Sequence, residues 1–337
     1  MAFVLAAALL AAIAVMRAWR RWKRRRIEER EEGWRRAMQE ATDDPAAGTL
    51  APIASLDLPE FLLLWNRVQE SRGGAAADNL AQLLRRHGLD QRALGLLRHG
   101  SLRRRLIAMT TVGLLRDERA WAILESIAGQ GGTVVSFAAA RAMIQIEPRR
   151  ALDALSASIV QRDDWSIARL GCIFAELGPA IVTPTLTTML ISRPRAGLDR
   201  VVKLAKFGER GRVAPIVRGW LSASDDPDVI MAALDYVEDE RELPWAKSAA
   251  SHAEWRVRMA AARALGRIGS ASELATLLEL LRDPIWWVRY HAAQALTRLH
   301  GMTPEELQLI RDNARDHFAA DMLAHALALM PIRRVRL

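Results

Sequence analysis

The side chains best suited to catalysis or metal binding are scattered along this sequence. Its seven histidines form no HExxH motif and no pair four residues apart, and GQGG (129–132) lacks the spacing of a nucleotide-binding loop. The single cysteine, Cys172, lies in an apolar stretch, which predicts a buried structural thiol. We therefore predict no catalytic residue, no metal site and no cofactor, and these observations favour binding over catalysis.

Two basic clusters and one tryptophan pair are the candidate partner-binding residues: Arg103, Arg104 and Arg105; Arg200, Lys203 and Lys206; and Trp286 with Trp287. Tryptophan is enriched where proteins bind one another. Cations are unfavourable at a helix N-terminus, so we expect acidic side chains to hold the first cluster. The alternative for both basic clusters is a solvated helix face. If these clusters do bind a ligand, the candidates are an acidic partner protein, lipid headgroups and phosphate.

The net charge of +9 lies at the two ends of the chain. Residues 17–36 carry +6 and the residues after Ile332 carry +3, which leaves the middle neutral. A neutral body of this kind is not the charge distribution of a general nucleic-acid-binding protein. Nucleic acid is therefore an unfavoured partner.

An uninterrupted apolar run of fifteen residues, Ala2 to Met16, precedes a dense basic block. A helix of that length is about 22 Å long, against a hydrocarbon core of about 30 Å. Residues 1–18 are predicted to form a transmembrane anchor, with the span extended by interfacial side chains. The alternatives are an interfacial or partner-packed helix and, least favoured, a cleaved signal peptide, because signal peptides place their charges before the apolar run.

Charge placement predicts the orientation of this anchor, with the N-terminus outside and the rest in the cytoplasm, as in a bacterial inner-membrane protein. Residues 19–40 are predicted to form a charged juxtamembrane helix that stands in water from Glu28 onward, and residues 41–55 a linker. The predicted contacts with anionic lipid headgroups are Arg17, Trp19, Arg20, Arg21, Trp22, Lys23, Arg24, Arg25 and Arg26.

The elements that must position the tryptophans are two near-copies of one helix. Residues 252–269 (HAEWRVRMAAARALGRIG) align without a gap with residues 283–300 (DPIWWVRYHAAQALTRLH), at an offset of 31 residues. Apolar residues recur at the spacing of one helical stripe, and small alanines within it allow close packing. A helix that repeats at this period must bury its stripe against its neighbours.

These copies resemble the HEAT-repeat family, in the short form common in bacterial proteins. The resemblance rests on Asp283, Val288 and Arg289 with the alanines that follow them, and on Val257 and Arg258, although His252 replaces the aspartate. It implies an all-α, right-handed α-solenoid and no particular activity. It also implies that Arg258 and Arg289 bond to the turn aspartate of an adjacent repeat.

The fold predicted from these features is an all-α, right-handed α-solenoid of about nine HEAT-like helical hairpins over residues 56–337, preceded by one transmembrane helix. The predicted function is a non-catalytic, membrane-anchored scaffold that binds another protein, an integral membrane protein such as a subunit of an exopolysaccharide synthase or glycosyltransferase complex. The alternatives are a nucleic-acid-binding protein of the DNA-repair type and, less favoured, a bilin-lyase-like protein.

Overall fold

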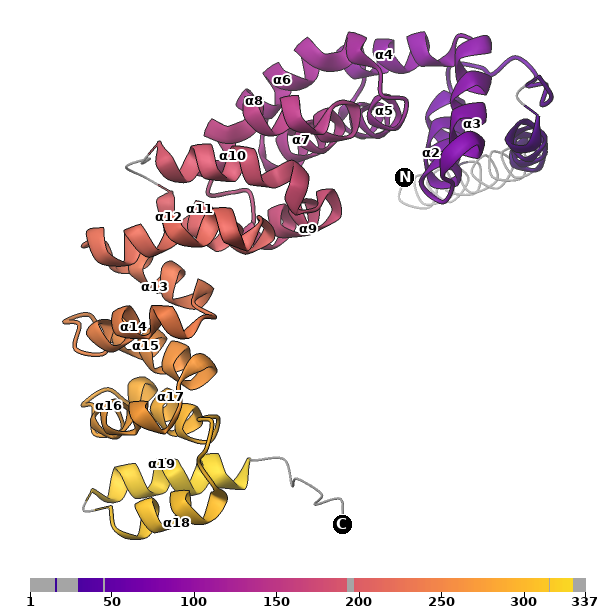
Figure 1. Ribbon diagram of the computed structural model, residues 1–337. Coiled ribbons are helices and arrows are strands. Elements are labelled where there is room, and N and C mark those ends of the chain that lie inside the picture. The colour runs from indigo at the N-terminus through magenta and orange to yellow at the C-terminus, as the bar shows by residue number, and fades with distance from the viewer. Residues whose placement is uncertain (1–15, 17–29, 45, 193–196, 315, 330–337) are drawn as a thin grey trace, which may run out of the picture. The chain divides into compact units, whose positions relative to one another are not determined.

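The computed structural model describes residues 16, 30–44, 46–192, 197–314 and 316–329. These residues form helices joined by turns, with one isolated parallel bridge between Ser270 and His300 (Figure 1). None of the helices in these ranges is long and apolar enough to cross a membrane. The predicted anchor, apart from Met16, and all nine predicted headgroup contacts lie outside the described residues.

The chain divides into two compact units, Met1–Leu155 and Ser156–Leu337. In the first unit, helices that follow one another in the chain pack in pairs, with α4 against α5 and α6 against α7. Its helices are α2 (Leu58–Glu70), α3 (Gly74–Arg86), α4 (Leu89–His99), α5 (Leu102–Leu114), η1 (Glu118–Ala120), α6 (Trp121–Gln130), α7 (Thr133–Ile146) and the first part of α8 (Pro148–Gln161).

The charged segment before α2 packs onto the first unit. Residues 30–43 are helical, and Trp34 is buried with its ring 5.4 Å from that of Phe61, edge to face. Arg86 donates hydrogen bonds to the carbonyl oxygens of Ala46 and Ala47, which holds the following segment in place. One face of this helix is therefore buried, at Trp34, Ala37, Met38 and Ala41, whereas the prediction places the whole helix in water from Glu28 onward.

The second unit is built from successive helical pairs in which the second helices stack directly on one another. α13, α15, α17 and α19 contact in that order (Figure 1). Its helices are α9 (Ile167–Leu177), α10 (Pro179–Ile191), α11 (Leu198–Leu204), η2 (Ala205–Phe207), α12 (Arg210–Ala223), α13 (Pro227–Tyr236), η3 (Glu240–Glu242), α14 (Leu243–Ala249), α15 (Trp255–Ile268), η4 (Ala271–Glu273), α16 (Leu274–Leu280), α17 (Trp286–Leu296), α18 (Pro304–Asp312) and α19 (His317–Ala328).

The 31-residue period persists through the last three stacked helices. Their first residues are Trp255, Trp286 and His317, and the third position of each, Val257, Val288 and Ala319, is buried. Small residues allow α15 and α17 to approach closely. A Cβ atom added at Gly266 would lie 2.6 Å from Cα of Ala295, so this crossing admits only glycine without a shift.

The first helix of each of the last three pairs starts with a capping box, in which two side chains satisfy the free backbone N–H groups of the first turn. The pairs of capping residues are Asp239 with Glu242, Ser270 with Glu273, and Thr303 with Glu306. Glu242 and Glu273 are each 1% exposed, whereas Glu306 is exposed. The buried glutamates therefore join the pairs as well as starting them.

Candidate protein-binding surface

Trp286 and Trp287 occupy the first two positions of α17 because the turn before them is fixed by Asp283. Oδ1 of Asp283 accepts a hydrogen bond from the backbone N–H of Ile285 at 2.9 Å, immediately before the helix begins. Both indole rings therefore project from the first turn, with Trp286 42% and Trp287 51% exposed. The structure thus places the predicted tryptophan pair together at the surface.

Two further aromatic side chains belong with this pair, Tyr290 on the same helix and Phe318 on the next stacked helix. We call Trp286, Trp287, Tyr290 and Phe318 the aromatic surface. The rings of Trp286 and Tyr290, one helical turn apart, are stacked at 5.1 Å, and Trp287 meets Trp286 edge to face at 4.7 Å. Phe318, in the second position of α19, is 53% exposed. Aromatic pairs in these geometries stabilise one another, so the rings hold a defined arrangement before any partner binds.

Comparison with the preceding repeat indicates that this exposure is a property of the last two repeats. Trp255, at the position of Trp286, packs against the core, and the residue after it is Arg256. Arg256 is an exposed cation paired with Glu254 and Asp228. Trp287 and Phe318 occupy the same outward position one and two periods later. Large apolar rings therefore stand where the earlier repeat carries a solvated charge, which is characteristic of binding surfaces.

Arg258 forms an ion pair with Asp283, which is the contact that the family resemblance implies. Its Nε and Nη2 donate to the two carboxylate oxygens of Asp283, at 2.6 and 3.0 Å. Its Nη1 donates to the carbonyl oxygens of His252 and Ala253, at 2.9 Å each. The hydrogen bond to Asp283 raises the pKa of Arg258, although burial acts in the opposite direction. The predicted bond to the turn aspartate of an adjacent repeat is confirmed for Arg258.

Arg289 adopts the equivalent position but lacks the aspartate, so the prediction is wrong for this residue. Its Nη1 donates to the carbonyl oxygens of Asp283 and Pro284, at 2.8 and 3.1 Å, as Arg258 does one repeat earlier. Its Nε is buried and has no hydrogen-bond partner among the described residues. The guanidinium carbon lies 5.3 Å from the ring centroid of Phe318, which brings a cation into the aromatic surface.

His291 borders the same surface on α17. Its ring is 5.2 Å from that of Tyr290. Burial lowers the pKa of His291, and the nearby positive charges of Arg263 and Arg298 lower it further. Neutral imidazole is therefore the favoured form near neutral pH, and the fixed positive charge beside the four rings comes from arginine.

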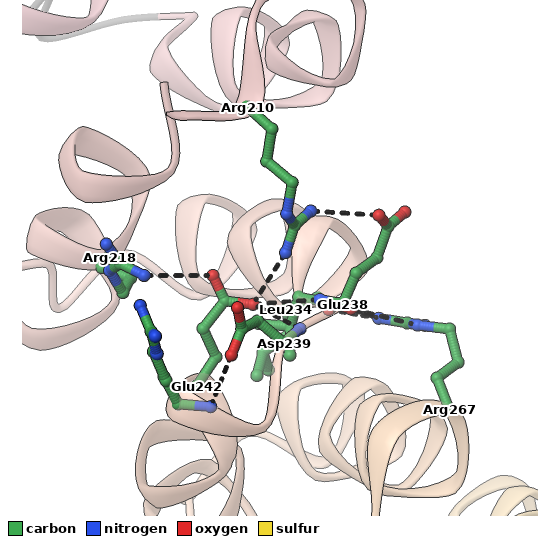
Figure 2. A network of polar contacts seen from close by, with 9 residues as sticks. Arg210, Arg218, Leu234, Glu238, Asp239, Glu242 and Arg267 are labelled. Carbon is green, nitrogen blue, oxygen red and sulfur yellow. Dashed lines mark hydrogen bonds and ion pairs between the residues drawn. The ribbon is translucent and has the colours of Figure 1, made fainter. Parts of the chain in front are cut away.

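The helical pair that precedes the aromatic surface, α14 with α15, is joined to α12 through a buried charge. Oε2 of Glu242 accepts from the backbone N–H groups of Glu238 and Asp239, at 3.0 and 3.1 Å, and from Arg210 Nη2 at 3.4 Å (Figure 2). Arg218 pairs with the other carboxylate oxygen at 3.9 Å. Two arginines and two backbone donors thus compensate one buried carboxylate, which indicates a structural joint.

Figure 2 also shows an arginine that donates hydrogen bonds to the carbonyl groups at the C-terminal end of α13. Arg267, from α15, donates from Nη2 to the carbonyl oxygen of Leu234 at 2.5 Å and from Nε to that of Val237 at 3.3 Å. Burial lowers the pKa of Arg267. The last carbonyl groups of one helix are therefore satisfied by a side chain of the next stacked helix.

The first predicted basic cluster lies at the start of α5, apart from the aromatic surface in sequence and in the other compact unit. Arg103 pairs with Glu60 at 3.8 Å, as expected for cations that need an acidic partner at a helix start. Arg104 is partly exposed, and Nε of Arg105 is buried with no partner within the described part of the chain. A partner-binding role for these three residues stays a prediction.

The second predicted basic cluster does not form one surface. Arg200 is only 8% exposed, and its guanidinium donates to the carbonyl oxygens of Ile159 and Trp165, at 3.2 and 2.7 Å. The prediction that Arg200 binds a partner is therefore wrong, because its side chain is buried and hydrogen-bonded to backbone carbonyl groups of the second unit. Lys203 pairs with Asp199 at 2.9 Å, and Lys206 lies over the ring of Phe207 at 5.2 Å.

Cys172 is exposed, which contradicts the prediction of a buried thiol. α9 buries Leu170, Ile173 and Phe174, and residue 172 falls on the opposite side of that helix. Over the ranges that the structure covers, no group of three or more His, Cys, Asp or Glu side chains is placed to hold a metal ion.

Comparison with known proteins identifies the repeats at the C-terminal end. Residues 242–330, about a quarter of the chain, match the family model described as HEAT repeats. Together with the all-helical structure, this match supports a HEAT-repeat helical protein, as the resemblance implies. The matched segment contains the complete aromatic surface. No curated protein matches the chain.

The sequence reasoning missed Tyr290, Phe318 and the unpaired edge of Arg289. The signals were present in the sequence. Tyr290 follows Trp286 by four residues, and Phe318 follows Trp287 by 31. The missing aspartate would have been found by extending the alignment to a third copy, in which Ala314 stands where the second copy has Asp283.

Proposed function

We propose that the protein is a non-catalytic HEAT-repeat scaffold that binds a partner protein through the aromatic surface of α17 and α19. The observation that carries this proposal is the exposure of Trp286, Trp287 and Phe318, each 42% or more, on neighbouring repeats. HEAT repeats in general serve protein interactions, which agrees with this assignment.

The physical support lies in what these rings gain from a partner. Large, rigid side chains bury much apolar surface for little loss of conformational entropy, and tryptophan is typical of the residues that dominate binding energy. The stacking of Trp286 on Tyr290 fixes the rings beforehand, which lowers the entropic cost of association. A surface of this composition favours a protein with an apolar segment as its ligand.

The proposal includes a membrane location, which rests on the sequence alone. Residues 1–18 would form a single-pass anchor in a bacterial inner membrane, with the N-terminus outside and the repeats in the cytoplasm. Residues 17–26 would contact anionic headgroups. The partner would then be an integral membrane protein, such as a subunit of an exopolysaccharide synthase or glycosyltransferase complex. Confinement near the bilayer raises the effective concentration of the repeats, so a modest contact suffices.

Site-specific photocrosslinking in the native cells tests the binding surface. A photoreactive amino acid at Trp287 or Phe318 should trap the same partner, and the same residue at Ile191, which is 65% exposed on α10, should not. Trp286→Ala combined with a crosslinker at residue 318 should abolish the adduct. Equal adducts at all three positions, or none at Trp287 and Phe318, would refute the aromatic surface as the binding site.

The single, exposed Cys172 makes the membrane topology directly testable. In intact cells, a membrane-impermeant maleimide should leave this thiol unlabelled, and permeabilised cells should label it fully. The full chain should remain in the membrane pellet after alkaline carbonate extraction, and deletion of residues 2–16 should release it. Labelling in intact cells would overturn the orientation, and release of the intact chain would overturn the anchor.

A further inference from the structure

Two arginines in the last repeats have the same backbone contacts but different partners for their outer edges. Arg258 and Arg289 each donate from Nη1 to the carbonyl oxygens six and five residues earlier. Nε and Nη2 of Arg258 bind both oxygens of Asp283, 25 residues later. Since the side chains are held alike, the Nε and Nη2 edge of Arg289 presents the same two-donor geometry.

The residue 25 positions after Arg289 is Ala314, which carries no acceptor. The hydrogen bonds of Arg289 to other described residues all come from Nη1, and its Nε is buried without a partner. A buried N–H group that makes no hydrogen bond has lost its water without gaining a partner, which is unfavourable. The arrangement therefore gains most from a ligand that accepts two parallel hydrogen bonds and carries negative charge.

One ring of the aromatic surface lies against this guanidinium. Phe318 lies over the Arg289 guanidinium, and the ring is half exposed, so a ligand would reach the edge by displacing this ring. The tryptophan pair lies three and two residues before Arg289 on the first turn of α17. A ligand that reaches Arg289 consequently also contacts apolar rings.

We infer that Arg289 binds the carboxylate of an aspartate or glutamate in a partner protein, and that apolar side chains beside this carboxylate pack on Trp286, Trp287 and Phe318. The inference rests on the proposed function and names the chemistry of its partner. The carboxylate takes the place that Asp283 occupies at Arg258. The positive charge of Arg298 near His291 also favours an acidic segment over a basic one, whereas Arg263 is already paired with Asp235.

Peptide selection on the full-length chain in mild detergent tests the inference. A displayed library of random twelve-residue peptides is selected on the wild-type protein, and the affinities of the enriched peptides are then measured by fluorescence anisotropy. Enriched peptides should carry an aspartate or glutamate beside an aromatic or aliphatic residue. Replacing that acid by its amide should weaken binding by about 10- to 100-fold, the value of a charged, two-point hydrogen bond.

Variants of the chain separate the carboxylate from the rings. Arg289→Gln should weaken the acidic peptide as much as the amide substitution does, and should leave the amide peptide unaffected. Arg256→Gln is the control, because this arginine lies in the preceding repeat and its guanidinium is already paired with Glu254 and Asp228. It should leave peptide affinity unchanged. Thermal unfolding monitored by circular dichroism verifies that each variant is folded.

Ala314→Asp supplies the missing carboxylate within the chain. The new side chain should pair with Arg289 as Asp283 pairs with Arg258, raise the unfolding temperature and reduce acidic-peptide binding at least tenfold. Unchanged binding in a folded Ala314→Asp variant would contradict the inference.

The outcomes also separate this inference from the proposed function. Peptides that bind equally as acid and amide, yet are lost in Trp287→Ala, would overturn the carboxylate site and leave the aromatic surface standing. Selection of no peptide that depends on Trp287 would count against both. Concentration-dependent self-association that Arg289→Gln abolishes, or binding of phosphatidylglycerol vesicles in place of peptides, would assign the edge to a second copy or a lipid and overturn the inference.

Discussion

The arginines of α15 differ in how much they contribute to stability, according to whether the acidic partner is buried. The side chains of Arg258 and Asp283 are 15% and 6% exposed. Arg258→Gln leaves a buried carboxylate with its main partner gone, so we expect a loss of about 2–4 kcal/mol in the free energy of unfolding. Urea denaturation measures this value.

Arg256, two residues earlier on α15, provides the control for that prediction. Its side chain is 45% exposed and its partners, Glu254 and Asp228, are also exposed to solvent. Such pairs contribute little because water screens them. Arg256→Gln should therefore leave the denaturation midpoint unchanged within error, and an equal loss in both variants would contradict the distinction.

Glu273 makes the stability of the last repeats sensitive to acid. Burial alone would raise the pKa of Glu273, but hydrogen bonds from Lys247, Ser270 and Ser272 outweigh it and hold the pKa below the ordinary 4.5. The folded state therefore binds this proton less readily than the unfolded state. Its stabilising contribution is present above about pH 4.5 and is lost as the pH falls through the folded pKa.

Glu273→Gln tests that linkage. The variant should be less stable than the wild type at pH 7, and the difference should shrink as the pH falls below about 4.5. Glu306→Gln is the matched control at the same capping-box position, where the glutamate is exposed and caps only its own helix. A difference for Glu273→Gln that stays constant with pH would show that the carboxylate charge is not the cause.

At the scale of helices, the close crossing of α15 on α17 depends on Gly266. Alanine favours helix by about 1 kcal/mol over glycine. At position 266, however, its Cβ would meet Ala295 at 2.6 Å and force the helices apart. We expect Gly266→Ala to destabilise the protein by about 1–3 kcal/mol, the usual cost of overpacking. Thermal and urea unfolding measure the change.

Gly219, inside α12, gives the opposite expectation and serves as the control. A Cβ atom there meets nothing within 4 Å. Gly219→Ala should therefore stabilise the protein by up to about 1 kcal/mol through helix propensity alone. If both substitutions shifted stability in the same direction, the close approach would not be the deciding factor at Gly266.

Sequence patterns predicted the helices well because turns and stripes are local signals. The two near-copies over residues 252–269 and 283–300 contain α15 and α17, and the 31-residue register holds through α19. The sequence was less informative about which face of a helix is covered. Arg200 is buried and Cys172 exposed because those outcomes depend on the neighbouring helix, which single-helix periodicity does not specify.

The candidate surface was only partly predictable for a similar reason. The tryptophan pair was identifiable from its residue type. Its exposure, the stacking of Tyr290 and the unpaired Nε of Arg289 arise from contacts between repeats, since Trp255 at the equivalent position packs against the core. The predicted anchor and headgroup contacts fall on residues that the structure does not describe, so they stay predictions.

At the scale of the second unit, stability should decline toward the last repeat. α15 packs against α13, α14, α16 and α17, whereas α19 packs against α17 and α18. In a repeat array, stability is approximately a sum of repeat and neighbour terms. Hydrogen exchange followed by mass spectrometry should therefore show faster exchange of α19 amides than of α15 amides. Equal protection would indicate that the unit opens only as a whole.

Because the register is constant at 31 residues, deletion of one whole repeat would keep the remaining helices in phase. Excision of residues 283–313 would join Arg282 to Ala314 and bring α19 into the position of α17, with its buried positions still in phase. Arg258 would then find an alanine where its aspartate had been. The vacant carboxylate position would move one repeat toward the N-terminus, and the guanidinium without an acidic partner would then be that of Arg258.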